Sequence, residues 1–130
     1  MSAVRGINHV TFAVSDLDRS IDFYQNTLGM SVKKNFGSGA YLEAGNDWIC
    51  LSLDPNAKSK AETDYTHVAF DVDDMNFDIL KSKLCAQRAC KWKENKSEGR
   101  SFYFLDPDGH KLEIHVGSLQ SRLDYMEKVA

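Results

Sequence analysis

The stretch "INHVTFAV" (residues 7–14) is repeated later in the chain as "YTHVAFDV" (residues 65–72), with the same His-Val-x-Phe-x-Val skeleton. Both stretches are rich in β-branched and aromatic residues and alternate in polarity, so each predicts a β-strand. Because an internal repeat shows which residues are equivalent, we expect the two histidines at matching places in two similar modules.

The same order of elements follows each copy of the repeat. The first module is predicted as a strand over 6–14, an amphipathic helix in "SDLDRSIDFYQNTLG" that stops at Gly29, and strands at 31–36, 40–45 and 48–53. The second is predicted as a strand over 65–72, a helix over about 74–86, and strands at 90–94, 101–105 and 111–116. A polar linker at 54–64 separates them, and a last amphipathic helix covers about 118–128.

These elements predict an α+β fold made of two tandem βαβββ modules, about residues 5–53 and 65–116, within one domain of the 130-residue chain. Each module alone is too small to bury much of its sheet. We therefore expect the modules to pair, either within the chain or across a dimer.

Composition and charge exclude several classes of function. The chain is 42% hydrophobic and 27% charged, as in ordinary globular proteins. The formal net charge of −3 argues against a nucleic-acid partner, because phosphate contacts need clustered Lys and Arg. We expect a cytoplasmic protein without a membrane partner, since the sequence has no signal peptide and no bilayer-spanning run. Three cysteines without a C-x-x-C spacing argue against both a disulfide framework and a zinc knuckle.

Three residues could hold a divalent metal. Alternation places His9 and His67 on the polar faces of the repeated strands, and Glu113 shares the polar face of the final strand with His115. Alone, a strand histidine is more often a hydrogen-bonded residue than a ligand. The repeat strengthens the metal hypothesis, because two imidazoles and one carboxylate can hold a metal and leave coordination positions open for a substrate.

Other polar and aromatic residues allow more than one interpretation. The stretch "KENKSEGRS" (residues 93–101) is either a solvated hairpin loop or a site for a cation or an anion. Aromatic strand residues are typical of core or dimer packing, and a helix arginine is often only an exposed charge. The residues concerned are Tyr41, Trp48, Tyr103 and Arg122.

Several motifs together resemble the vicinal oxygen chelate superfamily, and within it the fosfomycin glutathione transferases most closely. They are "NHVTFAV", "GAYLEAG", "WICLSLDP", "DYTHVAF", "WKENKSEGRSFYFLDPDGHKLEIHVGSL" (residues 92–119) and "SRL" (residues 121–123). The resemblance runs from about residue 5 to 125. Its most specific part is the loop followed by the "DPDGHKLE" strand.

The resemblance implies the ions and the assembly. His9, His67 and Glu113 match metal ligands, usually for Mn2+, in a site that two paired chains assemble, so a homodimer is implied. Other divalent first-row metals fit the same donors. The loop residues match a potassium site, which replaces the solvated-loop interpretation. They are Asn95, Ser97, Glu98, Gly99 and Ser101.

The resemblance also implies an activity, the addition of the glutathione thiol to the epoxide of fosfomycin. One set of residues matches groups that hold the phosphonate and the epoxide: Thr11, Lys93, Tyr103 and Arg122. A second set matches residues on the thiol side of the pocket: Tyr41, Trp48, Cys50 and Ser52. Among these, Tyr41 is the candidate for lowering the pKa of the thiol through a hydrogen bond.

Other functions remain open at this point. A related group hydrolyses fosfomycin with a carboxylate base, but "FGSGA" before Tyr41 contains no acid. Another related group uses a different bacterial thiol and magnesium, and the potassium-loop match points away from it. Extradiol dioxygenases generally need more modules, and glyoxalases need a fourth ligand that "WICLSL" does not supply. A non-catalytic drug-binding module would need no metal triad.

Overall fold

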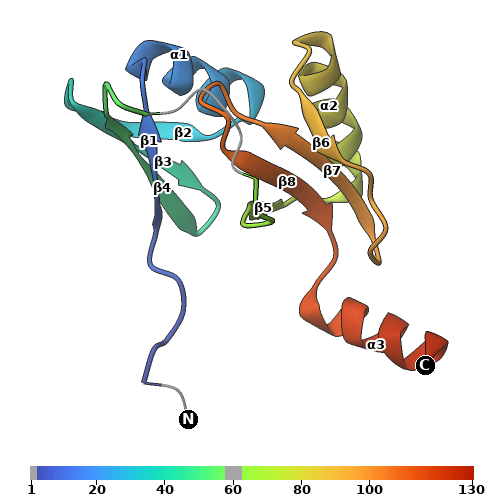
Figure 1. The fold of residues 1–130 in the computed structure, drawn as a ribbon. Coiled ribbons are helices and arrows are strands. Elements are labelled where there is room, and N and C mark those ends of the chain that lie inside the picture. The colour runs from blue at the N-terminus through green and yellow to red at the C-terminus, as the bar shows by residue number, and fades with distance from the viewer. Residues whose placement is uncertain (1–2, 58–62) are drawn as a thin grey trace. The chain divides into compact units, whose positions relative to one another are not determined.

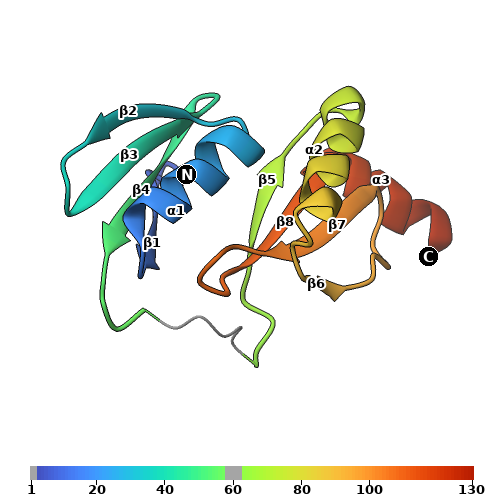
Figure 2. The same ribbon diagram turned by 90° about the horizontal axis from the view of Figure 1, so that it is seen from above.

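The computed structural model describes residues 3–57 and 63–130, and the chain divides into two compact units, Met1–Ser59 and Lys60–Ala130. Each unit contains one four-stranded sheet with a helix against one face (Figures 1 and 2).

The first unit follows the predicted βαβββ order, with β1 parallel to β4 and the other pairs antiparallel. The sheet order is β1-β4-β3-β2. Its elements are β1 (Val10–Val14), α1 (Leu17–Asp22), a π-helical turn (Phe23–Thr27), β2 (Ser31–Asn35), β3 (Gly39–Ala44) and β4 (Asp47–Leu53).

The second unit repeats this topology, with β5 parallel to β8 and the sheet order β5-β8-β7-β6. The repetition confirms the α+β prediction of two βαβββ modules. The elements are β5 (Val68–Asp71), α2 (Asp74–Ala86), β6 (Lys91–Lys93), β7 (Arg100–Leu105), β8 (Lys111–Val116) and α3 (Leu119–Val129).

The spacing of apolar residues predicted one regular helix here, but the structure has an α-helix that continues into a π-helical turn. It begins normally, because the Asp16 side chain caps it by accepting a hydrogen bond from the backbone nitrogen of Arg19 at 3.1 Å. Its last turn widens, since the Leu28 nitrogen donates to the Phe23 oxygen, five residues back, at 3.0 Å. The wide turn buries the adjacent side chains of Phe23 and Tyr24 together.

The repeated strands start later than predicted. Parallel pairing with β4 and with β8 begins at Val10 and Val68, so the predicted strand starts at residues 6 and 65 are wrong. His9 and His67 therefore lie immediately before the strands, at equivalent places. Behind them, alternate strand residues are buried in the core of each unit: Phe12, Val14, Leu42 and Leu51 in the first, and Phe104, Leu112 and Ile114 in the second. The opposite face of each sheet is left to polar and aromatic side chains.

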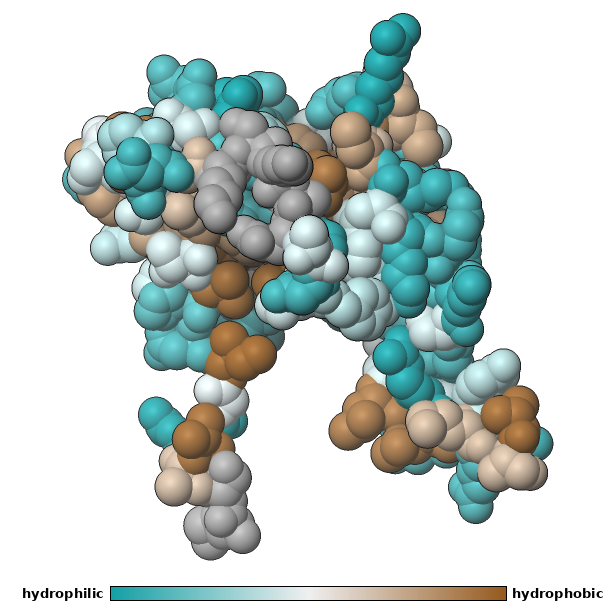
Figure 3. Space-filling view, in the orientation of Figure 1, coloured by the Kyte–Doolittle hydropathy of each residue, from teal (hydrophilic) through white to brown (hydrophobic). Residues whose placement is uncertain are grey.

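Helix α3 has no buried residue, although Ser118 and Ser121 form a capping box at its start. Several large apolar side chains on this helix are exposed: Leu119, Leu123, Tyr125, Met126 and Val129. In Figure 3, brown and tan atoms gather in the part of the view where Figure 1 draws α3. Within the described residues, no helix combines the length and the apolar character that crossing a membrane requires.

Candidate metal centre

The register of the second sheet places Ala69, Glu113, Tyr103 and Lys93 in one row across β5, β8, β7 and β6. The equivalent row of the first sheet consists of Thr11, Cys50, Tyr41 and Lys34. Directly paired residues point to the same side of a sheet. The fold therefore brings together residues that are far apart in the sequence. Cys50 takes the place in the first sheet that Glu113 takes in the second.

His67 and Glu113 form the centre of the second unit's polar face. The Nδ1 atom of His67 lies 2.9 Å from the Tyr65 carbonyl oxygen, and its Nε2 atom lies 2.9 Å from Oε1 of Glu113. Since a carbonyl can only accept, Nδ1 carries a proton, and Nε2 is the nitrogen that can bind a metal. Nε2 of His67 and Oε1 of Glu113 are both atoms that bind metals in proteins, and they lie side by side. The donor set therefore fits a divalent metal.

The second oxygen of Glu113, Oε2, is at the end of a chain of hydrogen bonds through Ser101 and His115. Ser101 Oγ lies 2.6 Å from Glu113 Oε2 and also 2.6 Å from Nδ1 of His115. A carboxylate can only accept, so the hydroxyl donates to Glu113 and His115 donates to the hydroxyl. A terminal nitrogen of the Arg122 guanidinium lies 3.5 Å from the remaining ring nitrogen of His115. Glu113, which is only 5% exposed, is thus held in one orientation by groups from β7, β8 and α3.

An aromatic group surrounds His67. The Trp92 ring meets the rings of His67 and Tyr103 edge-on, with centroids 5.3 and 5.2 Å apart. Its indole nitrogen donates to the backbone oxygens of Phe104 and Leu112, each at 3.1 Å. Trp92 is therefore fixed against two strands and limits the rotation of His67.

Lys93 is one of the cations on this polar face. Its ammonium donates to the Tyr65 hydroxyl at 2.7 Å and lies 4.8 and 4.9 Å from the ring centroids of Tyr65 and Tyr103. The hydrogen bond with Tyr65 raises the pKa of Lys93 from its ordinary value. Lys93 therefore stays charged at neutral pH and can pair with an anionic group.

Sequence reasoning missed Tyr65 and Trp92. Tyr65 lies two residues before His67, and that spacing along an extended segment is a usable signal for a shared face. Trp92 sits at a bulge in β6, where Lys91 pairs with Phe104 and Lys93 with Tyr103. A bulge disturbs the alternation on which sequence reasoning relies. The same shift occurs between Val32 and Lys34 of β2.

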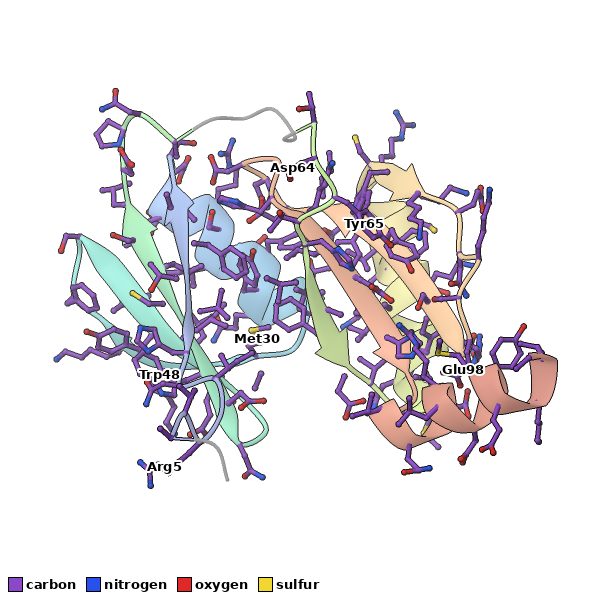
Figure 4. All side chains as sticks on the ribbon, turned by 60° about the horizontal axis from the view of Figure 1, so that its bottom comes forward. Arg5, Met30, Trp48, Asp64, Tyr65 and Glu98 are labelled. Atoms are coloured by element: carbon purple, nitrogen blue, oxygen red, sulfur yellow. The ribbon has the colours of Figure 1, made fainter. Side chains whose placement is uncertain are left out.

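The β6–β7 loop, predicted as a potassium site, has internal order. Asn95 Nδ2 donates to the Gly99 oxygen at 2.8 Å, and both the nitrogen and the hydroxyl of Ser97 donate to Asn95 Oδ1 at 3.0 Å. Oε1 of Glu98 is buried and has no hydrogen-bond partner in the part of the chain that the structure describes; Arg122 Nε lies 3.9 Å away. Figure 4 shows Glu98 beside α3. A buried, unpaired carboxylate oxygen is costly, which fits a cation in this loop.

The first unit holds the other predicted residues. The His9 ring stacks on Trp48 with centroids 4.1 Å apart, and Tyr41 meets Trp48 edge-on at 5.4 Å (Figure 4 labels Trp48). Asn8 Oδ1 lies 2.7 Å from Nδ1 of His9, which leaves Nε2 as the available nitrogen, as in His67.

The remaining residues of the first unit lie on the sheet near this cluster. Thr11, Cys50 and Tyr41 are neighbours in one row, and Ser52 pairs with Ala13 and Gly39. Tyr41 is 42% exposed. Among the described residues, no group of three His, Cys, Asp or Glu side chains is close enough to hold a metal.

Comparisons with known proteins extend over most of the chain. Residues 6–114 match the family model described as Glyoxalase/Bleomycin resistance protein/Dioxygenase superfamily. The chain is 49% identical to the glutathione transferase FosA of Serratia marcescens over 92% of its own length and 86% of that protein. It is 37% identical to the metallothiol transferase FosB of Lysinibacillus sphaericus, over 96% and 92% of the two chains.

Solved structures show the same fold. The fosfomycin resistance protein FosX of Listeria monocytogenes superposes with a TM-score of 0.81 at 29% identity, over 94% of this chain and 98% of that one. A Glu-to-Gln mutant of the Listeria FosX protein has been solved in complex with Mn(II) and 1S,2S-dihydroxypropylphosphonic acid. It superposes with a TM-score of 0.78 at 28% identity, over 92% of this chain and 98% of that one.

Proposed function

The chain belongs to the Glyoxalase/Bleomycin resistance protein/Dioxygenase superfamily, and on that premise we propose that it is a metal-dependent fosfomycin resistance enzyme that adds the glutathione thiol to the epoxide of fosfomycin. The observation that carries the proposal is the 49% identity to a glutathione transferase, FosA, across 86% of that protein. The ordered His67–Glu113 pair supports it from the structure, because the pair offers metal donors on a polar face.

We propose that His67 and Glu113 of one chain and His9 of a paired chain hold the metal, with Mn2+ as the first candidate. Bound there, the metal would supply Lewis-acid polarisation of the epoxide oxygen. The chain's own residues set the geometry of the site: Tyr65 fixes the ring of His67, and Ser101 fixes the carboxylate of Glu113.

The other residues act on the substrates. We assign to Lys93 and Arg122 the neutralisation of the phosphonate charge, and to Tyr103, which is in the same row as Glu113 and beside Lys93, the lining of the phosphonate site. Thr11 is the candidate donor to the oxygen released from the epoxide, and Tyr41 is the candidate hydrogen-bond donor to the thiolate. The loop of Asn95, Ser97, Glu98, Gly99 and Ser101 would hold K+ and add positive charge near the phosphonate.

The overall reaction is an addition. The thiolate sulfur forms one carbon–sulfur bond while one carbon–oxygen bond of the epoxide breaks, and the proton from the thiol ends on the released oxygen. Stabilising the negative charge that develops on that oxygen lowers the barrier.

The requirement for a thiol is a direct test. We expect purified protein with Mn2+ and K+ to consume fosfomycin only when glutathione is present, and the product should have the combined mass of the two substrates. The measurement is mass spectrometry of matched reactions with glutathione, with cysteine and with no thiol.

Hydrolysis is the second candidate, because the structure of the FosX mutant holds dihydroxypropylphosphonic acid, which differs from an epoxypropylphosphonate by one water molecule. Formation of this diol without any thiol would replace the transferase proposal by hydrolysis. The absence of an acid in "FGSGA" before Tyr41 supports the transferase.

We also propose a homodimer, which the exposed apolar face of α3 supports, since large apolar patches usually mark interfaces. If His9 of one chain joins His67 and Glu113 of its partner, the variants His9→Ala and Glu113→Gln should each be inactive alone. Mixed by co-expression, they should recover about a quarter of wild-type activity, since half of the dimers are mixed and each mixed dimer has one intact site.

The recovered activity, compared with co-expression of two copies of the same variant, checks this arrangement. Failure of the mixture to recover any activity, while the mixed dimer is detected by native mass spectrometry, would show that each site is built within one chain.

A further inference from the structure

His115 on β8 has no role in the reaction proposed above, although its side chain is only 14% exposed and lies against two glycines. A Cβ added at Gly99 would lie 2.8 Å from Cε1 of His115, and one added at Gly117 would lie 2.7 Å from its Nε2 atom. Both glycines have positive φ, +81° and +152°. The imidazole therefore occupies space that a side chain at either position would take.

The hydrogen bonds of His115 run in one direction. Its Nδ1 atom lies 2.6 Å from Ser101 Oγ, which lies 2.6 Å from Oε2 of Glu113. Because the hydroxyl donates to the carboxylate, Nδ1 donates to the hydroxyl. The other ring nitrogen, Nε2, lies 3.5 Å from a terminal nitrogen of Arg122, which can only donate. A neutral imidazole with its proton on Nδ1 satisfies both neighbours.

This arrangement determines where the hydrogen of the Ser101 hydroxyl points. A hydroxyl has one hydrogen, which can turn toward any nearby acceptor. Since Nδ1 of His115 carries a proton, it cannot accept that hydrogen, which is left for Oε2 of Glu113. With Oε2 engaged, Oε1 of Glu113, beside Nε2 of His67, is the carboxylate oxygen left to bind a metal. Hydrogen bonds that follow one another in this way strengthen each other.

We propose that His115 is a positioning residue for Glu113, that it acts through Ser101, and that it sets the metal affinity of the candidate metal centre. The inference rests on the proposed function, because it takes Glu113 as a metal ligand. It requires no contact of His115 with the metal or with a substrate. A histidine that only filled the space beside Gly99 and Gly117 would behave differently in the following tests.

Two substitutions separate the hydrogen bond from the packing. His115→Leu nearly preserves the volume of the side chain and removes the donor. His115→Asn is smaller but keeps a donor, because the amide nitrogen of Asn lies close to the place of Nδ1 in His. Loss of a group that supports a metal ligand typically costs about 10–100-fold in metal affinity. Because His115 acts through Ser101, we expect a loss of about tenfold in His115→Leu and of less than about threefold in His115→Asn.

The measurement needs no turnover. The full chain, freed of metal by chelation, is titrated with Mn2+, and the electron paramagnetic resonance signal of free Mn2+ gives the affinity. Thermal unfolding shows that each variant is folded at the temperature of the titration. If packing were the only role of His115, the smaller Asn would lose at least as much affinity as Leu. That result, or wild-type affinity in His115→Leu, would overturn the proposal.

A variant that keeps the imidazole provides an independent check. The Cβ of Gly117→Ala would force the His115 ring out of its place, so the Mn2+ affinity should fall by about three- to tenfold. Gly6→Ala is the matched control, because Gly6 has φ of +155° and no atom lies within 4 Å of its added Cβ. It should keep wild-type affinity. If the two variants bound Mn2+ equally well, the place of the ring would not matter to the metal and the proposal would fail.

The inference and the proposed function fail separately. Wild-type Mn2+ affinity in His115→Leu would remove the positioning role and leave the transferase proposal standing. Formation of the diol without a thiol would remove the transferase proposal, and a tenfold weaker binding of Mn2+ by His115→Leu, about the size expected of a supporting group, would still establish the positioning role.

Discussion

Replacing Glu113 by Gln is expected to abolish the turnover of fosfomycin. Gln has nearly the same shape and can still accept the hydrogen bond from Ser101, but it removes the negative charge beside Nε2 of His67. Even the loss of a group that only supports a metal ligand commonly costs 10–100-fold in metal affinity, so the loss of the ligand charge should cost at least about 100-fold. Isothermal titration with Mn2+ and an assay of fosfomycin consumption measure the two effects.

Glu43→Gln is the matched control, because Glu43 is also a carboxylate on a strand but is exposed. Its only ion-pair partner among the described residues is Lys33, whose ammonium lies 4.0 Å away. It should retain wild-type metal affinity and turnover. If Glu113→Gln protected cells against the drug at full strength, sequestration by a non-catalytic binding module would become the better function.

Replacing Gly99 by Ala is expected to disorder the predicted potassium loop and lower stability. Gly99 has φ of +81°, and a Cβ there would lie 2.5 Å from the Val116 carbonyl oxygen and 2.8 Å from Cε1 of His115. The carbonyl belongs to β8 and cannot rotate away. The left-handed backbone alone costs an alanine about 1–2 kcal/mol, and the clash adds strain of similar size, so we expect a loss of about 2–4 kcal/mol.

Gly29→Ala separates the two costs. Gly29 has the same φ of +81°, but no atom lies within 4 Å of its added Cβ. It should lose only about 1–2 kcal/mol and keep the stimulation by K+. Thermal unfolding and a K+ titration of activity compare the variants. Equal losses of stability in both would contradict the close approach of Gly99 to Val116.

The repeat in the sequence predicted the fold well because the pattern of β-branched and aromatic residues is set by burial, which each module must satisfy. The element order and the position of α2 follow from it, whereas the order of the strands within each sheet comes from the structure. The starts of β1 and β5 were predicted too early. A parallel strand begins where its pairing with the neighbouring strand begins, here with β4 and β8, and the polarity pattern does not show that point.

Long-range partners could not be predicted from the pattern. Alternation indicated that Glu113 and His115 share a face, but only the register shows that Ser101 lies between them. The bulge in β6 explains why Trp92 was missed. An extra residue in a strand changes the face of the sheet on which each following side chain lies. The chemical roles of all the candidate site residues remain predictions.

The placement of the two tryptophans has a practical consequence. The chain contains two Trp residues, and each lies against one of the proposed metal histidines, Trp48 on His9 at 4.1 Å and Trp92 at 5.3 Å from His67. All of the indole emission of the protein therefore arises beside the donors that the metal would use. Because Mn2+ is paramagnetic and can quench a nearby indole, the protein carries its own optical reporter in each module for the occupation of its site.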